Sequence, residues 1–173
     1  MLLRLAEPED AMRVAHVHVR SWQKAYRGLL PDEYLDGLRA EDRAKRYDLA
    51  NRDVLKPVSI VAADEDVDEE NICGFATVSQ ARDADASRHG ELCALYVDPE
   101  YWGQRVGCAL MAAARVHLVE AGFRNAILWV MAGNARAERF YRIDGWLPDP
   151  DGLRRTDTVW GVTVEEIRYR CEL

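Results

Sequence analysis

The stretch Tyr96–Gly122, YVDPEYWGQRVGCALMAAARVHLVEAG, changes from a strand pattern to a helix pattern. The strand ends at Asp98-Pro99, and apolar residues then recur at helical spacing up to Gly122. The first turns of the predicted helix contain Gly107, although a glycine inside a helix costs about 1 kcal/mol relative to alanine. A glycine at this point therefore indicates a compensating interaction near the start of the helix.

Two interpretations of this helix start are open. The first N–H groups of a helix have no internal partners and lie at the positive end of its dipole, so a phosphate can bind there when no side chain blocks it. Gly107, Cys108 and Ala109 are small, and Arg105 can add a cation beside a phosphate. Alternatively, Gly107 lets the helix pack closely on the preceding strand. The spacing alone does not separate the two.

The rest of the chain predicts a mixed α/β fold in one domain, residues 1–173. An amphipathic helix over residues 8–26 should bury Met12, Ala15, Val19, Trp22 and Tyr26. Shorter helical pieces follow within residues 31–50, and a later helix is capped by Asn134. The predicted strands cover residues 2–6, 57–64, 72–81, 91–97, 125–133, 145–149 and 158–173, with a hairpin loop at residues 64–71 and a strand at 91–97 buried on both faces.

Composition excludes several classes of protein. The net charge of −7 argues against a nucleic-acid partner, which requires a basic face. No apolar run reaches the roughly 18 residues of a membrane span, and no signal peptide is visible. The four dispersed cysteines predict reduced thiols in a cytoplasmic protein. Neither a P-loop nor a G-x-G-x-x-G motif is present, and the histidines lack ligand-spaced partners, so we expect no metal.

The segment Gln104–Ala109 fits the Q/R-x-x-G-x-G/A motif and resembles the GNAT superfamily of acetyl-CoA-dependent N-acetyltransferases. The flanking segments Glu91–Leu110 and Asn134–Trp146 are similar to the family at its usual distance, and His18–Leu38 looks like a bacterial branch of it. The resemblance extends over nearly the whole chain. It implies a mixed, mostly antiparallel twisted sheet of about six or seven strands, flanked by helices and splayed at the acetyl-CoA cleft. One departure is Arg105, where close relatives commonly have glycine.

The resemblance also implies a site for acetyl-CoA. Backbone amides around Gly107 would hold the CoA pyrophosphate, backbone groups of the strand before the helix would pair with the pantetheine arm, and an asparagine would contact the cofactor. These residues are Leu95, Tyr96, Val97, Gln104, Arg105, Val106, Gly107, Cys108, Ala109 and Asn134.

Two residues are candidates for the chemistry. Glu91 lies six residues before Val97, so an ideal strand places both on one face, and a carboxylate near an apolar cleft can serve as a base. Tyr141 follows Asn134 by two helical turns, and its phenol can protonate a thiolate. Glu91 matches the glutamate that acts as base in some family members, and Tyr141 matches the family's recurrent tyrosine. The alternatives are a solvated glutamate at a strand start and a tyrosine packed between helix and sheet.

Other candidates are less specific. Cys93 shares the face of Glu91 and could accept an acetyl group, but no histidine near it in sequence would activate it. The family builds its acceptor pocket where Trp22, Tyr26 and Tyr34 lie, although Trp22 could equally belong to the core.

The sequence thus predicts an N-acetyltransferase that moves acetyl from acetyl-CoA to a primary amine of a small molecule by direct attack. The alternatives are a protein acetyltransferase, acting on N-termini or lysines, and a non-catalytic acyl-CoA-binding regulatory module. Retention of both Glu91 and Tyr141 disfavours the module, because a binder needs only the helix-start site. The identity of the amine and the oligomeric state, a homodimer included, stay open.

Overall fold

The computed structural model describes residues 1–64, 71–159 and 161–173. The elements, in chain order, are β1 (Leu2–Leu5), η1 (Pro8–Asp10), α1 (Ala11–Ala25), α2 (Asp32–Asp36), α3 (Ala40–Ala44), β2 (Val58–Asp64), β3 (Asn71–Gln80), η2 (Ala84–Ala86), β4 (Gly90–Val97), η3 (Pro99–Tyr101), α4 (Val106–Glu120), β5 (Asn125–Met131), α5 (Ala135–Ile143), β6 (Leu147–Pro148), β7 (Arg154–Val159) and β8 (Val162–Glu172). The hairpin loop predicted for residues 64–71 falls mostly outside the described residues.

The strands form one mixed sheet in the order β1-β2-β3-β4-β5-β8-β6, with β7 paired to β8. Among the strands of the described residues, only β4 and β5 pair in parallel, and every other pair is antiparallel. The mostly antiparallel sheet is therefore confirmed. The described residues contain eight strands rather than six or seven, because the polar segment Arg154–Val159 lacks the apolar alternation that marks a strand in sequence but still pairs with β8.

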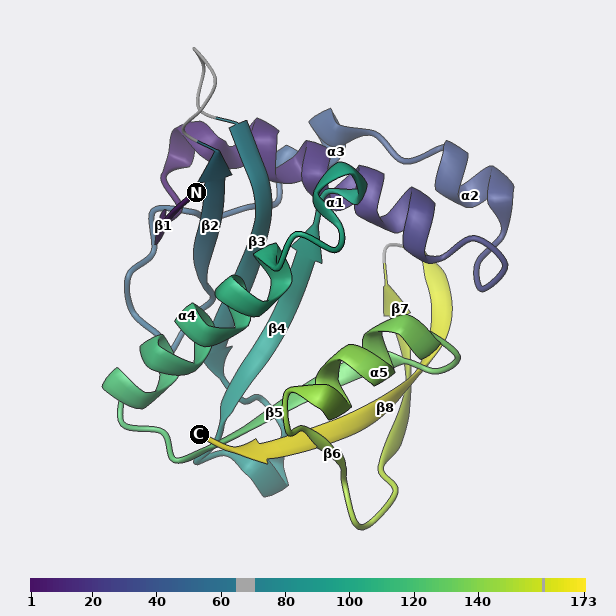
Figure 1. The fold of residues 1–173 in the computed structure, drawn as a ribbon. Coiled ribbons are helices and arrows are strands. Elements are labelled where there is room, and N and C mark those ends of the chain that lie inside the picture. The colour runs from purple at the N-terminus through teal and green to yellow at the C-terminus, as the bar shows by residue number, and fades with distance from the viewer. Residues whose placement is uncertain (65–70, 160) are drawn as a thin grey trace.

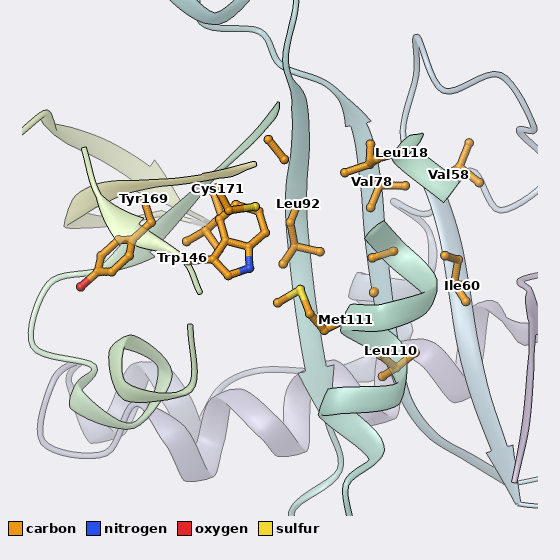
Figure 2. Close-up of a cluster of buried hydrophobic side chains, with 14 of the residues drawn as sticks. Val58, Ile60, Val78, Leu92, Leu110, Met111, Leu118, Trp146, Tyr169 and Cys171 are labelled. Carbon is orange, nitrogen blue, oxygen red and sulfur yellow. The ribbon is translucent and has the colours of Figure 1, made fainter. Parts of the chain in front are cut away.

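Helices cover both faces of the sheet (Figure 1). α4 and α5 lie on one face, and α1 crosses the other. The largest buried cluster lies between α4 and the sheet, where Leu110, Met111 and Leu118 pack against Leu92 and Val78 (Figure 2). On the opposite face, α1 packs against side chains of β3 and β4. The two faces of the sheet thus have separate hydrophobic clusters, and an opening between β4 and β5 would connect one face with the other.

The buried face of α1 differs from the predicted one, since it also includes Val14, Val17 and His18 and does not include Met12. Ala15 and Val19 are buried against α3, and Trp22 is buried as well, but Met12 is 41% exposed. The prediction for Met12 was wrong because the cluster formed with α3 does not extend to the first turn of α1. No helix within the three described ranges is both long and apolar enough to cross a bilayer.

Candidate active site

The parallel strands β4 and β5 separate after a short contact. Their pairing covers Gly90↔Ala126, Glu91↔Ile127 and Leu92↔Leu128 and then stops. A cleft of about 600 Å³ opens beyond this point. The sequence predicted a strand that is buried on both faces. This was wrong for most of β4, because its first three residues are buried and the next five are partly exposed. The expected splay is present and leaves an unpaired strand edge along the cleft.

The N-terminus of α4 lies at one end of this cleft. Val106, Gly107 and Cys108 line the wall, and their N–H groups precede the first intrahelical bond, from Ala109 N–H to the Arg105 carbonyl at 3.0 Å. Arg105 is the N-cap, and its side chain makes no capping bond. It has a φ of +64°, a left-handed conformation in which glycine is favoured. This conformation is consistent with the glycine that the family resemblance led us to expect at this position.

Close packing does not account for Gly107. A Cβ atom there would lie 3.6 Å from the Phe140 ring and 3.7 Å from Val97 Cγ2, which are ordinary contacts. Gly74 and Gly90 behave differently, since a Cβ would approach the Tyr96 carbonyl to 2.9 Å and the Leu118 side chain to 2.7 Å. The geometry thus favours the first interpretation of Gly107, in which the bare backbone is left accessible at the cleft.

The edge of β4 offers two residues to the cleft. Asp98 N–H donates to the Cys73 carbonyl at 2.8 Å, and alternate residues of an antiparallel ladder are bonded in the same way, so the peptide groups of Tyr96 also face β3. The peptide groups of Leu95 and Val97 then face the cleft, where the Val97 carbonyl accepts a bond from Trp102 Nε1 at 2.8 Å. Tyr96 therefore contributes its ring to the wall rather than the backbone groups that the sequence suggested.

A β-bulge changes the facing of Glu91. The register passes from Val78↔Leu92 to Thr77↔Ala94, so Cys93 is an extra residue in β4. Side chains before the bulge exchange faces relative to those after it. The expectation that Glu91 and Val97 share a face was wrong for this reason.

The two faces of β4 contact different helices. Leu92, Leu95 and Val97 pack in the cluster under α4, whereas Ala94 and Tyr96 pack in the cluster under α1. Glu91 lies directly opposite Ser79, whose hydroxyl is 3.2 Å from Cys93 Sγ. Glu91 therefore belongs to the α1 face of the sheet.

Glu91 lies beneath the wall of the cleft and does not line it. Its side chain is buried, and its carboxylate accepts a hydrogen bond from the backbone N–H of Arg82. Burial raises the pKa of Glu91, and the positive charges of Arg82 and Arg155 partly oppose that rise. Burial also raises the pKa of the Cys93 thiol to about 12, with a further contribution from Glu91. Cys93 is consequently a neutral thiol, which disfavours its role as a nucleophile.

Tyr141 and Asn134 both line the cleft from α5. Asn134 Oδ1 accepts a bond from Ala137 N–H at 3.1 Å, which confirms the predicted cap. The Tyr141 ring packs edge-on against Phe140 and Trp146, with centroids 5.6 and 6.4 Å away. Burial raises the pKa of Tyr141, and neighbouring Tyr96 adds to the rise. The phenol thus keeps its proton at any neutral pH.

An aromatic wall follows on the α1 face. Trp22 and Tyr26 line the cleft, with ring centroids 4.7 Å apart, and His18 stacks on Tyr96 at 4.3 Å. Burial holds the pKa of His18 well below its usual value, so its ring is neutral. Tyr34 does not line the cleft and packs against the cluster that contains Trp22 and Tyr26.

Two of the predicted cofactor-binding residues do not line the cleft. Gln104 and Ala109 lie outside the wall, and Gln104 Nε2 instead donates to the Glu100 carbonyl at 2.9 Å. The sequence interpretation missed several residues that do line the cleft, namely His18, Arg82, Trp102, Trp129, Arg136, Arg155, Asp157 and Glu166. A signal existed only for Arg136, a cation in the first turn of α5, where the helix dipole disfavours positive charge. Its guanidinium stacks 3.4 Å above the Trp102 ring.

No group of three histidine, cysteine or acidic side chains that could hold a metal ion occurs in the part of the chain that the structure describes. All four cysteines are free thiols.

Residues 16–146 match the family model described as the acetyltransferase (GNAT) family. The uncharacterized N-acetyltransferase YuaI of Bacillus subtilis is 33% identical over 132 residues, which cover 76% of this chain and 72% of that protein. Among solved structures, the PaiA N-acetyltransferase of Thermoplasma acidophilum in complex with coenzyme A superimposes with a TM-score of 0.70 at 20% identity, over 100% of both chains. YncA of Salmonella typhimurium, a putative acetyltransferase with its cofactor acetyl-CoA, gives 0.69 at 14% identity, over 99% of this chain and 93% of that one.

Proposed function

The chain belongs to the acetyltransferase (GNAT) family, and on this premise we propose that it transfers the acetyl group of acetyl-CoA to a primary amine of a small molecule. The observation that carries the proposal is the separation of β4 from β5 after Leu92. It opens a cleft whose wall includes both the accessible N-terminus of α4 and the aromatic residues under α1. One wall thus offers an anion site and a pocket for an acceptor.

The described residues fit acetyl-CoA. The N–H groups of Val106, Gly107 and Cys108 are unsatisfied within the helix and would bind the pyrophosphate, with the Arg105 guanidinium nearby. The peptide groups of Leu95 and the N–H of Val97 would pair with the pantetheine arm, as an added strand does. When bound, acetyl-CoA supplies an activated thioester. The family's asparagine, Asn134, retains its side-chain N–H₂ for a contact because only Oδ1 is used by the cap.

The chemistry requires two proton transfers at opposite sides of the reacting carbonyl. The amine nitrogen forms a bond to the acetyl carbon and loses a proton, and the C–S bond breaks to leave a thiolate. Glu91 accepts the amine proton through a water molecule, since its carboxylate lies below the wall and its pKa is raised by burial. Tyr141 donates its phenolic proton to the thiolate sulfur. This water would connect the Glu91 carboxylate to the cleft past Arg82 and Cys93, which neighbour Glu91 and line the cleft.

The proposal is tested by release of free thiol from acetyl-CoA in the presence of a panel of primary amines. We expect amine-dependent release together with formation of the N-acetyl product. A protein acetyltransferase would instead turn over peptides and leave the small amines unchanged. An acyl-CoA-binding module would bind CoA in calorimetry and release no thiol with any acceptor. Tyr141→Phe provides the matched control, because it should retain CoA binding and lose turnover.

A further inference from the structure

We propose that the acceptor amine carries a carboxylate group and that the guanidinium of Arg82 binds it on the α1 face of the cleft. The acceptor would accordingly be an amino acid or a related amino acid-like molecule. This inference rests on the proposed function, because it names the class of amine that the same cleft accepts.

Arg82 lies in the part of the cleft that faces the aromatic wall. Along β5, Leu128 and Val130 pack under α4, whereas Met131 packs with Trp22 and Tyr26. Trp129 is two residues from Met131, so its side chain lies on the same face of the sheet, and it lines the cleft together with Arg82. The N-terminus of α4, where the pyrophosphate would bind, belongs to the other face. An acceptor that enters from the α1 face would therefore meet Arg82, and the thioester would reach it through the gap between β4 and β5.

The acidic side chains that line the cleft do not pair with Arg82, and Glu91 acts on its charge only from outside the cleft lining. Arg155 Nε bonds to Glu166 Oε2 at 2.7 Å, and Asp157 lies 3.8 Å from the same guanidinium. These three groups line the cleft and largely satisfy one another. Within residues 1–64, 71–159 and 161–173, by contrast, no hydrogen bond or ion pair joins the Arg82 guanidinium to a side chain. Glu91 bonds only to the backbone N–H of Arg82. Arg82 is exposed and lines the cleft, so its guanidinium has donors available for a ligand there.

The segment that carries Arg82 is held firmly in place. Asp83 Oδ2 accepts bonds from Trp129 Nε1 at 3.2 Å and from Arg168 at 3.0 Å. Arg168 is 3% exposed and also bonds to Asp85, two residues further along the segment. On the other side of Arg82, Ala81 N–H donates to the His89 carbonyl at 2.9 Å. These bonds orient the backbone of Arg82 before any ligand binds, and preorganisation of this kind favours binding of a specific group.

A planar guanidinium binds a carboxylate through two parallel hydrogen bonds, which gives both affinity and orientation. With the carboxylate at Arg82, the neighbouring amine would face the gap between the strands. Binding would also neutralise a positive charge that opposes the raised pKa of Glu91. The correct acceptor would thereby make the proposed base stronger. An acceptor amine without a carboxylate would lack this effect.

The test compares amino acids with their carboxamides, which differ only in the carboxylate. Values of kcat/KM, referred to the free amine at saturating acetyl-CoA, should be about 10- to 100-fold higher for the acids in the wild type. Arg82→Gln should remove this ratio. Arg88→Gln is the matched control, since Arg88 is exposed on the same segment and outside the cleft, and it should keep the ratio.

A binding measurement separates this inference from the proposed function. N-acetyl amino acids and their amides, titrated into the CoA complex, should show the same ratio in affinity and the same dependence on Arg82 without any turnover. Equal affinity for acids and amides, an unchanged ratio in Arg82→Gln, or better turnover of peptides than of every amino acid would overturn the inference. Absence of thiol release with all acceptors would instead overturn the proposed function.

Discussion

The substitution Tyr141→Phe removes one hydroxyl from the cleft and tests the assignment of the general acid. The ring contacts with Phe140 and Trp146 do not involve that hydroxyl. Among the described residues, no side chain forms a hydrogen bond to it. The free energy of unfolding should therefore change by less than about 1 kcal/mol, the usual contribution of a single neutral hydrogen bond.

The effect on turnover should be far larger. Loss of a positioned general acid lowers the rate by about 10²–10⁴, or roughly 3–5 kcal/mol of barrier. The raised pKa of Tyr141 keeps its phenol protonated through neutral and mildly basic pH, so the loss should be nearly constant from pH 6 to pH 9. A residue that only shaped the wall would instead alter CoA affinity and KM.

Single-turnover thiol release at saturating acetyl-CoA, measured across this pH range, is the appropriate assay because it isolates the chemical step from product release. Calorimetric titration of CoA and thermal unfolding serve as controls for binding and folding. If the variant folds, binds CoA normally and reacts within a few-fold of the wild-type rate, Tyr141 is a packing residue and the proposed donor of the proton must be sought elsewhere.

Five further substitutions, at four positions, test other parts of the structure. Gly107→Glu should weaken CoA binding by about tenfold or more in calorimetry, whereas Gly107→Ala should retain it, because a Cβ fits there at 3.6 Å; equal affinity in all three proteins would place the pyrophosphate elsewhere. Glu91→Gln should remove the acid limb of the kcat/KM profile, and a profile that coincides with wild type would exclude this base. Since the folded-state pKa of Glu91 is raised, its contribution to stability is present at low pH and lost as pH rises, so the same variant should gain stability relative to wild type at pH 7 but not at pH 4, as followed by thermal unfolding. Arg105→Gly should raise the free energy of unfolding by about 0.5–1 kcal/mol because it relieves a left-handed conformation, and a decrease in denaturant titrations would contradict this. Arg168→Met leaves three aspartates without their shared buried cation and should cost about 3–5 kcal/mol in the same titrations; a loss below about 1 kcal/mol would show that the network is not stabilising.

The sequence by itself determined the elements that local physics governs. The strand that ends at Asp98-Pro99, the helix that follows Gly103 and the Asn134 cap follow from side-chain period, proline and glycine placement, and capping chemistry. These features depend on neighbours within a few residues, so they can be predicted from the sequence alone. The resemblance to the family allowed us to predict the sheet, its splay and the cofactor cleft as well.

Only the tertiary structure decided how these elements present their side chains. The extra residue Cys93 moved Glu91 to the α1 face, because the side-chain period of a strand is two and one inserted residue reverses it. Arg82 reaches the cleft because Asp83 is tied to Trp129 and to Arg168, a residue 85 positions away in sequence. Strand register, bulges and ion pairs of this kind arise from contacts between distant segments, and their free energies depend on burial that no local pattern encodes.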